Sequence, residues 1–110
     1  MTYTPIRILH VEDDPVEVER IRHLLCGTAE SPFHIENASC LDEALCRFDP
    51  ASLDLILLDL GLPDSRGIDT IRRMRSRAGD VPTVVLSSAE DESLATEAVR
   101  AGAQDYLVKT

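Results

Sequence analysis

The sequence predicts an α/β fold in which a five-stranded parallel sheet has helices on both faces, giving three layers. Short apolar runs alternate with segments of helical periodicity along the whole chain, as expected for repeated β-α units. Residues 53–58 are almost continuously apolar, which is typical of a central strand buried on both faces. The 110 residues suffice for one domain, and a hydrophobic content of 44% can fill its core.

Nine elements are expected, in the order β-α-β-α-β-α-β-α-β. The strands are predicted at residues 6–11, 33–38, 53–58, 83–86 and 106–108. The helices are predicted from Pro15 to about Cys26, from the Ser39 region to before Pro50, after Gly67, and from about Asp91 to Ala101. Each crossover between parallel strands is expected to be right-handed.

Several residues are expected to cap these helices. Asp14 followed by Pro15 is a typical helix start, and Gly27 is placed to end that helix in a left-handed conformation. The segment from Ser39 to Asp42 fits a capping box for the second helix. The buried faces of the last two helices are predicted to hold Ile68, Ile71 and Met74, and Leu94, Ala98 and Ala101.

Charge and composition exclude several classes of function. The formal net charge of −9 argues against direct binding to nucleic acid or to an anionic membrane. The longest apolar stretch is interrupted by Asp54, Asp59 and Gly61, so no membrane span is expected. The three cysteines form no Cys-x-x-Cys pair and are interpreted as reduced thiols. Together with the lack of a signal-peptide pattern, this predicts a cytoplasmic protein.

Polar residues follow four of the five predicted strands. They are Glu12, Asp13 and Asp14 after the first strand, Asp59 at the end of the third, Ser87 and Ser88 at the end of the fourth, and Lys109 after the fifth. Parallel α/β sheets bind ligands at the carboxyl ends of their strands, so these side chains are expected to converge. The second strand ends in Asn37 and Ala38 and is expected to contribute little.

Converging carboxylates repel one another unless a positive charge compensates them. Lys109 supplies one such charge, and a hard divalent cation such as Mg²⁺ suits a set of carboxylates, a backbone carbonyl and water. A carboxylate can attack phosphorus to give an aspartyl phosphate. The oxygens of the transferred group then need a cation, an ammonium and a hydroxyl nearby, and these are the residue types expected here.

Four segments together resemble the receiver domains of two-component response regulators, the CheY-like family. They are residues 8–15 (ILHVEDDP), 55–64 (LILLDLGLPD, followed by Gly67), 82–87 (PTVVLS) and 101–109 (AGAQDYLVK). The resemblance covers the whole chain, with the segments in the same order. It implies a flavodoxin-like fold with strand order 2-1-3-4-5.

The resemblance also implies roles for individual residues. Asp59 matches the phosphorylated residue, and Lys109 matches the ammonium that acts beside it. Ser87 matches the switch hydroxyl, with Ser88 as its competitor, while Tyr106 is either the aromatic residue of the switch or a buried core tyrosine. The implied Mg²⁺ ligands are Glu12 through water, Asp13, Asp59 and the carbonyl of Gly61, whereas Asp14 is interpreted as a helix cap.

Members of this family receive the phosphoryl group from a sensor histidine kinase or a phosphotransfer protein. The chain is therefore expected to catalyse only its own phosphorylation and dephosphorylation, and to be no enzyme for a separate substrate. Partner binding is expected to switch through the fourth helix and fifth strand, toward an output domain or protein or a second copy of the chain. Gly61 and Ala89 match positions beside the attacking water and cannot orient it, so slow dephosphorylation is expected.

Two departures from the family pattern affect the end of the chain. Thr110 occupies the place where the family usually has a proline in a cis bond after the lysine. The family's fifth helix has no counterpart, and it would bury apolar side chains worth roughly 1.5–3 kcal/mol each. Residues 1–110 are therefore expected to be a receiver domain truncated before its fifth helix, or one whose exposed face is covered by a neighbouring chain.

Other interpretations are weaker. A Mg²⁺-dependent phosphatase or nuclease would need Asp-x-Asp after the first or third strand, and the sequence has Glu12-Asp13-Asp14 and Asp59-Leu60-Gly61 instead. A degenerate receiver used only for docking would not need every reactive position filled. His10, His23 and His34 are unclustered and are interpreted as structural or surface residues. The arginines at 66, 72, 73, 75 and 77 are interpreted as a solvated face, with partner docking as the alternative.

Overall fold

The computed structural model describes residues 5–87 and 92–109, so Ser88, Ala89, Asp91 and Thr110, which the predictions above include, lie outside the described residues. Five strands form one parallel sheet: β1 (Ile6–Val11), β2 (Phe33–Ala38), β3 (Leu55–Asp59), β6 (Thr83–Ser87) and β7 (Asp105–Val108). Their order is β2-β1-β3-β6-β7. When only the strands of this sheet are numbered along the chain, β6 and β7 are the fourth and fifth, and the order is 2-1-3-4-5. The predicted strand order is therefore confirmed.

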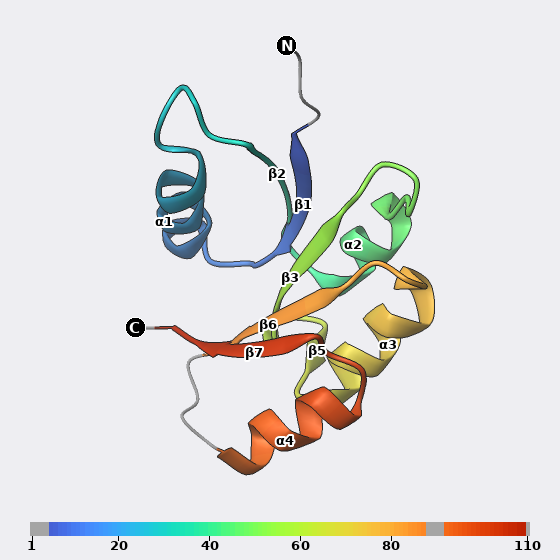
Figure 1. The fold of residues 1–110 in the computed structure, drawn as a ribbon. Helices are drawn as coiled ribbons and strands as arrows, with labels where there is room; N and C mark the ends of the chain where they lie inside the picture. The colour runs from blue at the N-terminus through green and yellow to red at the C-terminus, as the bar shows by residue number, and fades with distance from the viewer. Residues whose placement is uncertain (1–4, 88–91, 110) are drawn as a thin grey trace.

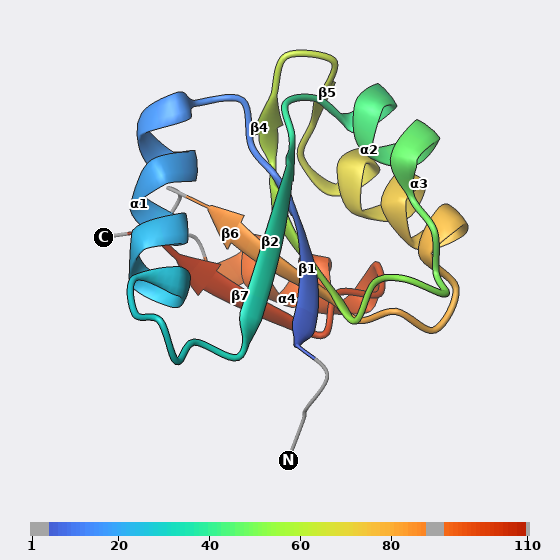
Figure 2. The same cartoon turned by 90° about the horizontal axis from the view of Figure 1, so that it is seen from above.

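Helices cover the two faces of the sheet unequally (Figures 1 and 2). Helix α1 (Pro15–Cys26) lies alone on one face. Helices α2 (Leu41–Arg47), α3 (Ile68–Ala78) and α4 (Glu92–Arg100) lie on the other. A small hairpin that the sequence did not predict, β4 (Gly61–Leu62) with β5 (Ser65–Arg66), joins β3 to α3.

The main hydrophobic core lies between the sheet and helices α2, α3 and α4. Its strand residues include Val11, Ile56 and Leu58, all inaccessible to solvent. Its helix residues include Ile71, Met74 and Ala98, each with no exposed surface, while Ile68, Leu94 and Ala101 pack against its margin. The predicted inward faces of α3 and α4 are thus confirmed.

The face beside α1 is less well covered. Its core is a smaller cluster of Ile8, Ile35, Leu57 and Leu86, against which α1 packs only partly buried side chains. Leu107 pairs with Leu86 on this side of the sheet and remains 47% exposed. This face therefore presents apolar surface next to strands β6 and β7.

Both ends of α1 were predicted correctly, at Pro15 and Cys26, but the conformation of Gly27 after it was not. The Asp14 side chain accepts a hydrogen bond from the Val16 amide at 2.9 Å, as expected for a cap. Gly27, in contrast, has φ −72° and ψ −4°, which is a right-handed conformation. A Cβ atom there would overlap the carbonyl oxygen of His23, so glycine is required by close packing and not by a left-handed turn.

The capping interaction of α2 is displaced by one residue from the prediction. The helix is capped by Cys40, whose Sγ accepts from the Glu43 amide at 3.4 Å. Glu43 in turn accepts hydrogen bonds from the Ser39 amide and hydroxyl, at 3.2 and 2.9 Å. The prediction placed the cap at Ser39 and the partner residue at Asp42. Because the helix begins at Leu41, the cap is Cys40 and the residue three positions later is Glu43, whose longer side chain reaches back to Ser39.

The basic run on α3 is only partly a solvated face. Arg75 donates to the carbonyl of Val81 at 2.9 Å. Arg77 donates to the carbonyl of Phe48 at 3.0 Å and lies over its ring. Two of the five arginines thus bind loop carbonyls, one after the end of α2 and one before the start of β6. Arg66 and Arg72 are exposed, as predicted.

Candidate functional site

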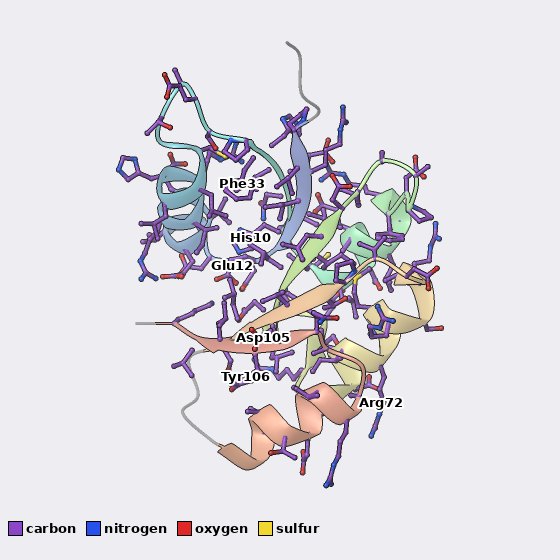
Figure 3. The ribbon with its side chains drawn as sticks, viewed as in Figure 1. His10, Glu12, Phe33, Arg72, Asp105 and Tyr106 are labelled. Carbon is purple, nitrogen blue, oxygen red and sulfur yellow. The ribbon has the colours of Figure 1, made fainter. Side chains whose placement is uncertain are left out.

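The predicted site residues lie around one cavity of about 750 Å³ at the carboxyl ends of the strands. Figure 3 shows Glu12 in the space between α1 and the sheet. The described residues that line the cavity are Glu12, Asp13, Asp14, Glu17, Asp59, Leu60, Gly61, Gly67, Ser87, Leu94 and Lys109. The structure therefore brings together the six residues expected to act on a phosphoryl group or a cation, and it adds Glu17 and Leu94, which sequence reasoning missed.

Backbone pairing in the sheet places these side chains. Asp59 is the last residue of β3 and pairs with Leu86. Glu12 directly follows β1, and its amide donates to the carbonyl of Ala38 at 2.9 Å. Lys109 follows β7, and its amide donates to the carbonyl of Ser87 at 2.7 Å. Since parallel strands end at the same edge, these residues must share one region of the surface.

A buried ion network links the first and last strands. Lys109 Nζ lies 2.7 Å from Glu12 Oε1 and 3.1 Å from Asp59 Oδ1. The Glu12 side chain is 1% exposed, that of Asp59 10% and that of Lys109 16%. Burial alone would lower the pKa of Lys109, but its hydrogen bonds to Glu12 and Asp59 outweigh that effect and raise it. The ammonium, which belongs to the only lysine of the chain, is therefore charged.

The same cavity contains more negative charge than Lys109 can neutralise. Glu12, Asp13 and Asp59 each offer a carboxylate oxygen, and these three atoms lie within 4.8 Å of one another. Glu12 Oε2 is buried and has no hydrogen-bond partner among the described residues. An unpaired buried carboxylate oxygen is costly, and oxygen atoms at this spacing suit a hard divalent cation. These residues could therefore hold such an ion.

Glu12 is the carboxyl group most perturbed by this environment. Its burial, followed by its interaction with Asp59, raises the pKa of Glu12 from 4.5 to about 7, although Lys109 opposes the shift. Glu12 therefore exchanges a proton close to neutral pH when no cation is bound.

Stability and cation binding are expected to respond to pH in opposite directions. The folded-state pKa of Glu12, about 7, exceeds the ordinary value of 4.5, so its contribution to stability is complete below pH 4.5 and is lost as the pH rises to about 7. Cation affinity is expected to increase over the same window, because a ligand must be ionised. Titration of Mg²⁺ by calorimetry at several pH values, with melting temperatures of the cation-free protein, checks both trends.

A Glu12→Gln variant is the control for this prediction. Burial and the charge of Lys109 lower the pKa of His10 from 6.5 to about 4, so protonation of His10 destabilises both proteins at acidic pH. The difference between the two melting curves isolates Glu12. A difference that does not change between pH 4.5 and about 7 would contradict the assignment of the shift to Glu12.

The second strand supports the end of β1. The side-chain amide of Asn37 donates to the carbonyls of His10, Glu12 and Ala38, at 2.9, 3.1 and 3.2 Å. Asn37 thus holds the backbone at the end of β1, from which Glu12 projects. None of the described residues that line the cavity comes from β2, as predicted, but sequence did not show the carbonyls that the Asn37 amide reaches.

The remaining predicted residues lie as follows. Ser87 is 7% exposed and lines the cavity. Tyr106 is half-buried and packs against the margin of the main core, on the side of β7 that faces α4 (Figure 3). His10 is buried, whereas His23 and His34 are exposed.

Comparison with known protein families agrees with this geometry. The family model for the response regulator receiver domain matches residues 8–110. The chain belongs to this family. It is thus a receiver domain of two-component response regulators, a signalling domain, and the resemblance seen in its motifs is confirmed.

Curated relatives of this receiver domain are named as regulatory proteins. The KDP operon transcriptional regulatory protein KdpE of Escherichia coli is 40% identical over 102 residues, which cover 93% of this chain and 44% of KdpE. The two-component response regulator PhoP of Pseudomonas aeruginosa is 34% identical over 105 residues, covering 94% of this chain and 45% of PhoP. The receiver domain therefore spans less than half the length of these relatives.

Solved structures share its fold. CheY in the CheX-CheY-BeF3-Mg complex from Borrelia burgdorferi superposes with a TM-score of 0.86 at 21% identity, over 97% of this chain and 80% of that one. The phosphorylated cyanobacterial phytochrome response regulator RcpA gives a TM-score of 0.81 at 26% identity, over 97% and 82% of the two chains. Among the helices described in this receiver domain, none has the length and apolar character needed to traverse a bilayer.

Proposed function

We propose that this receiver domain accepts a phosphoryl group on Asp59 and that Mg²⁺ assists the transfer. The observation that carries the proposal is the placement of Asp59 at the end of β3, bonded to the partly buried ammonium of Lys109 and close to Glu12 and Asp13. RcpA, a relative in fold, has been solved in a phosphorylated form, which supports the same chemistry here.

The cation site is formed by the acidic residues of the cavity. Asp13, Asp59 and the carbonyl of Gly61 are proposed as direct ligands, with Glu12 acting through water. The buried, unpartnered Glu12 Oε2 supports this set, because a metal-bound water would satisfy it. Bound Mg²⁺ would supply positive charge against the negative charge of the transferred phosphoryl group.

In the proposed step, an Asp59 carboxylate oxygen attacks the phosphorus atom of the donor. A new oxygen–phosphorus bond forms, and the bond from phosphorus to the donor's leaving group breaks, with the electron pair departing on that group. Lys109 already holds Asp59 Oδ1, which leaves Oδ2 on the side of Gly61 to attack. Lys109 and the Ser87 hydroxyl then face the oxygens of the attached phosphoryl group.

The signal is proposed to leave the site through α4 and β7. Ser87 ends β6 at the cavity. Tyr106 belongs to the neighbouring strand β7 and packs against the core beneath α4, so the two residues connect the site to that face. Exposed Val99 and Val108 offer apolar contacts there. The proposed partners are a histidine kinase or phosphotransfer protein, an output domain or protein, and a second receiver domain, all in the cytoplasm. No separate substrate is proposed to be turned over.

The test is incubation with acetyl phosphate, with and without Mg²⁺, followed by intact-mass spectrometry. The expected result is a mass increase of one phosphoryl group that requires Mg²⁺ and is lost in alkali, as expected for an acyl phosphate. Multiple turnover of a generic phosphate ester, without a stable adduct, would instead indicate a phosphatase.

The lifetime of the phosphorylated form is expected to depend on Gly61. A Cβ atom at this position would lie 3.7 Å from Asp59 Oδ2, so any side chain there would stand beside the phosphoryl group. Glycine cannot orient an attacking water, and slow hydrolysis is expected. A Gly61→Asn variant is expected to hydrolyse faster, by about 10-fold or more, since positioned polar groups contribute roughly 10²–10⁴-fold.

The decay of the labelled protein, followed by mass spectrometry after the donor is removed, measures this effect. Gly61→Ala is the matched control, because it adds the Cβ atom without a polar group, and its rate should stay near that of the wild type. Equal rates for Gly61→Asn and Gly61→Ala would refute a role for the side chain at this position.

We also propose that the exposed apolar surface beside α1 is covered in the full-length protein by a segment following Thr110. Leu107, at 47% exposure, and the half-buried Val84 support this, as does the greater length of the relatives. A sedimentation experiment that finds residues 1–110 to be a stable monomer would count against it.

A further inference from the structure

The loop that follows Asp59 is a short hairpin that cannot be stable by itself. Gly61 pairs with Arg66 and Leu62 pairs with Ser65, so each strand has only two residues. Even full-length isolated hairpins are marginal in water. The position of Gly61 at the cavity must therefore depend on contacts that the hairpin makes elsewhere.

Asp64, at the tip of this hairpin, makes a two-point contact with helix α2. Its Oδ1 accepts a hydrogen bond from the Leu41 amide at 2.9 Å, and its Oδ2 accepts one from the Asp42 amide at 2.8 Å. Amides in the first turn of a helix have no partner inside the helix, so an external carboxylate satisfies them. Burial would raise the pKa of Asp64, but the amides of Asp42 and Leu41 outweigh it and lower it, which keeps the carboxylate charged.

Two further contacts help to attach the hairpin. Leu62 is fully buried in the main core. The Ser65 and Thr70 hydroxyls lie 2.7 Å apart, which ties the second strand of the hairpin to α3. Among the hydrogen bonds described above for the hairpin's side chains, those of Asp64 are the ones that reach α2, and residues 62 and 63 alone separate Asp64 from Gly61. A shift of the tip would therefore be passed directly to the cavity.

We propose that Asp64 is a positioning residue, which holds the Gly61 carbonyl at the cation site by tying the hairpin to the start of α2. The inference rests on the proposed function, in which Gly61 is a ligand. Asp64 itself is not among the described residues that line the cavity, so it acts through the backbone of the hairpin and not on the cation or the phosphoryl group.

The test compares the Mg²⁺ dissociation constants of four proteins by calorimetry: the wild type, Asp64→Ala, Asp64→Asn and Asp54→Ala. Asp64→Ala is expected to weaken Mg²⁺ binding by about 10-fold, the low end of what loss of a supporting partner costs a metal site. Asp64→Asn keeps one acceptor oxygen and should lose less. Asp54 is the matched control, because its carboxylate also accepts a hydrogen bond from a backbone amide, that of Arg7, at 2.9 Å. Asp54 lies just before β3, at the end of the sheet opposite the cavity, so its replacement should leave Mg²⁺ affinity unchanged.

Melting temperatures separate positioning from simple stabilisation. If Asp64→Ala melts lower than the wild type but binds Mg²⁺ like the wild type, the positioning role is overturned. If Asp64→Ala does not fold, Asp64→Asn decides in the same way. Acetyl phosphate labelling of the wild type separates failure of the proposed function from failure of this inference. A wild type that neither binds Mg²⁺ nor is phosphorylated refutes the proposed function. A wild type that does both, with Asp64 variants of unchanged Mg²⁺ affinity, refutes only the role of Asp64.

Discussion

An Asp59→Asn variant is expected to take up no phosphoryl group from acetyl phosphate, whether or not Mg²⁺ is present. An amide oxygen is a poor nucleophile, and loss of the nucleophile in enzymes with covalent intermediates costs on the order of 10⁶-fold. The same change removes one of three neighbouring carboxylates. Because Asp59 helps to raise the pKa of Glu12, that pKa should fall, and the cation-free protein should melt at a higher temperature.

Intact-mass spectrometry and melting curves measure the two effects on the same sample. Asp69→Asn is a suitable control, since Asp69 is an exposed carboxylate in the first turn of α3 and does not line the cavity. It should be phosphorylated normally. Phosphorylation of Asp59→Asn at the wild-type rate would show that another residue is the acceptor.

Replacing Lys109 with methionine is expected to have the largest combined effect on stability and chemistry. The ammonium bonds to both Glu12 and Asp59, and its removal leaves two buried carboxylates facing one another. Breaking a buried ion pair from one side costs roughly 3–5 kcal/mol. Here about 1–3 kcal/mol is expected, because burial already raises the pKa of Glu12 to about 7 and its carboxyl can take up a proton.

The rate of phosphoryl transfer to Lys109→Met should fall by more than its loss of stability alone would cause. Loss of one group that stabilises negative charge in a transition state costs roughly 10²–10³-fold in rate. Urea unfolding with and without Mg²⁺ tests the first effect, and the rate of labelling tests the second. Added Mg²⁺ should restore more stability to Lys109→Met than to the wild type. Equal restoration in the two proteins would contradict a shared electrostatic site. Lys109→Arg is the control: it keeps the positive charge and should lose less stability than Lys109→Met.

Most of the sheet could be predicted because each strand is an apolar run with clear limits. The first two strands, Ile6–Val11 and Phe33–Ala38, were predicted without error. The third begins at Leu55 instead of residue 53, since Asp54 exchanges hydrogen bonds with Arg7 outside the ladder. The β4–β5 hairpin was not predictable from periodicity, because strands of two residues contain no repeat to detect.

The candidate site was predictable for a related reason. Parallel strands deliver their last residues to one edge, so the position of Asp59 or Lys109 in sequence nearly determines its position in space. Asn37 and Asp64 were missed because each acts on backbone groups from remote segments. Sequence reports the type of a side chain but not the amide or carbonyl that it meets. The one available signal was a polar Asn at the end of an otherwise suitable strand.

The pairing of Glu12 with Lys109 spans 97 residues and joins the first strand to the last. A contact between residues so far apart in sequence closes a long loop, which costs chain entropy. β7 is also an edge strand, bonded to β6 alone within the described sheet. Because Lys109 directly follows this edge strand, detachment of β7 from β6 would also withdraw the ammonium from Glu12 and Asp59, so the charge balance of the acidic residues depends on how firmly the edge strand is held.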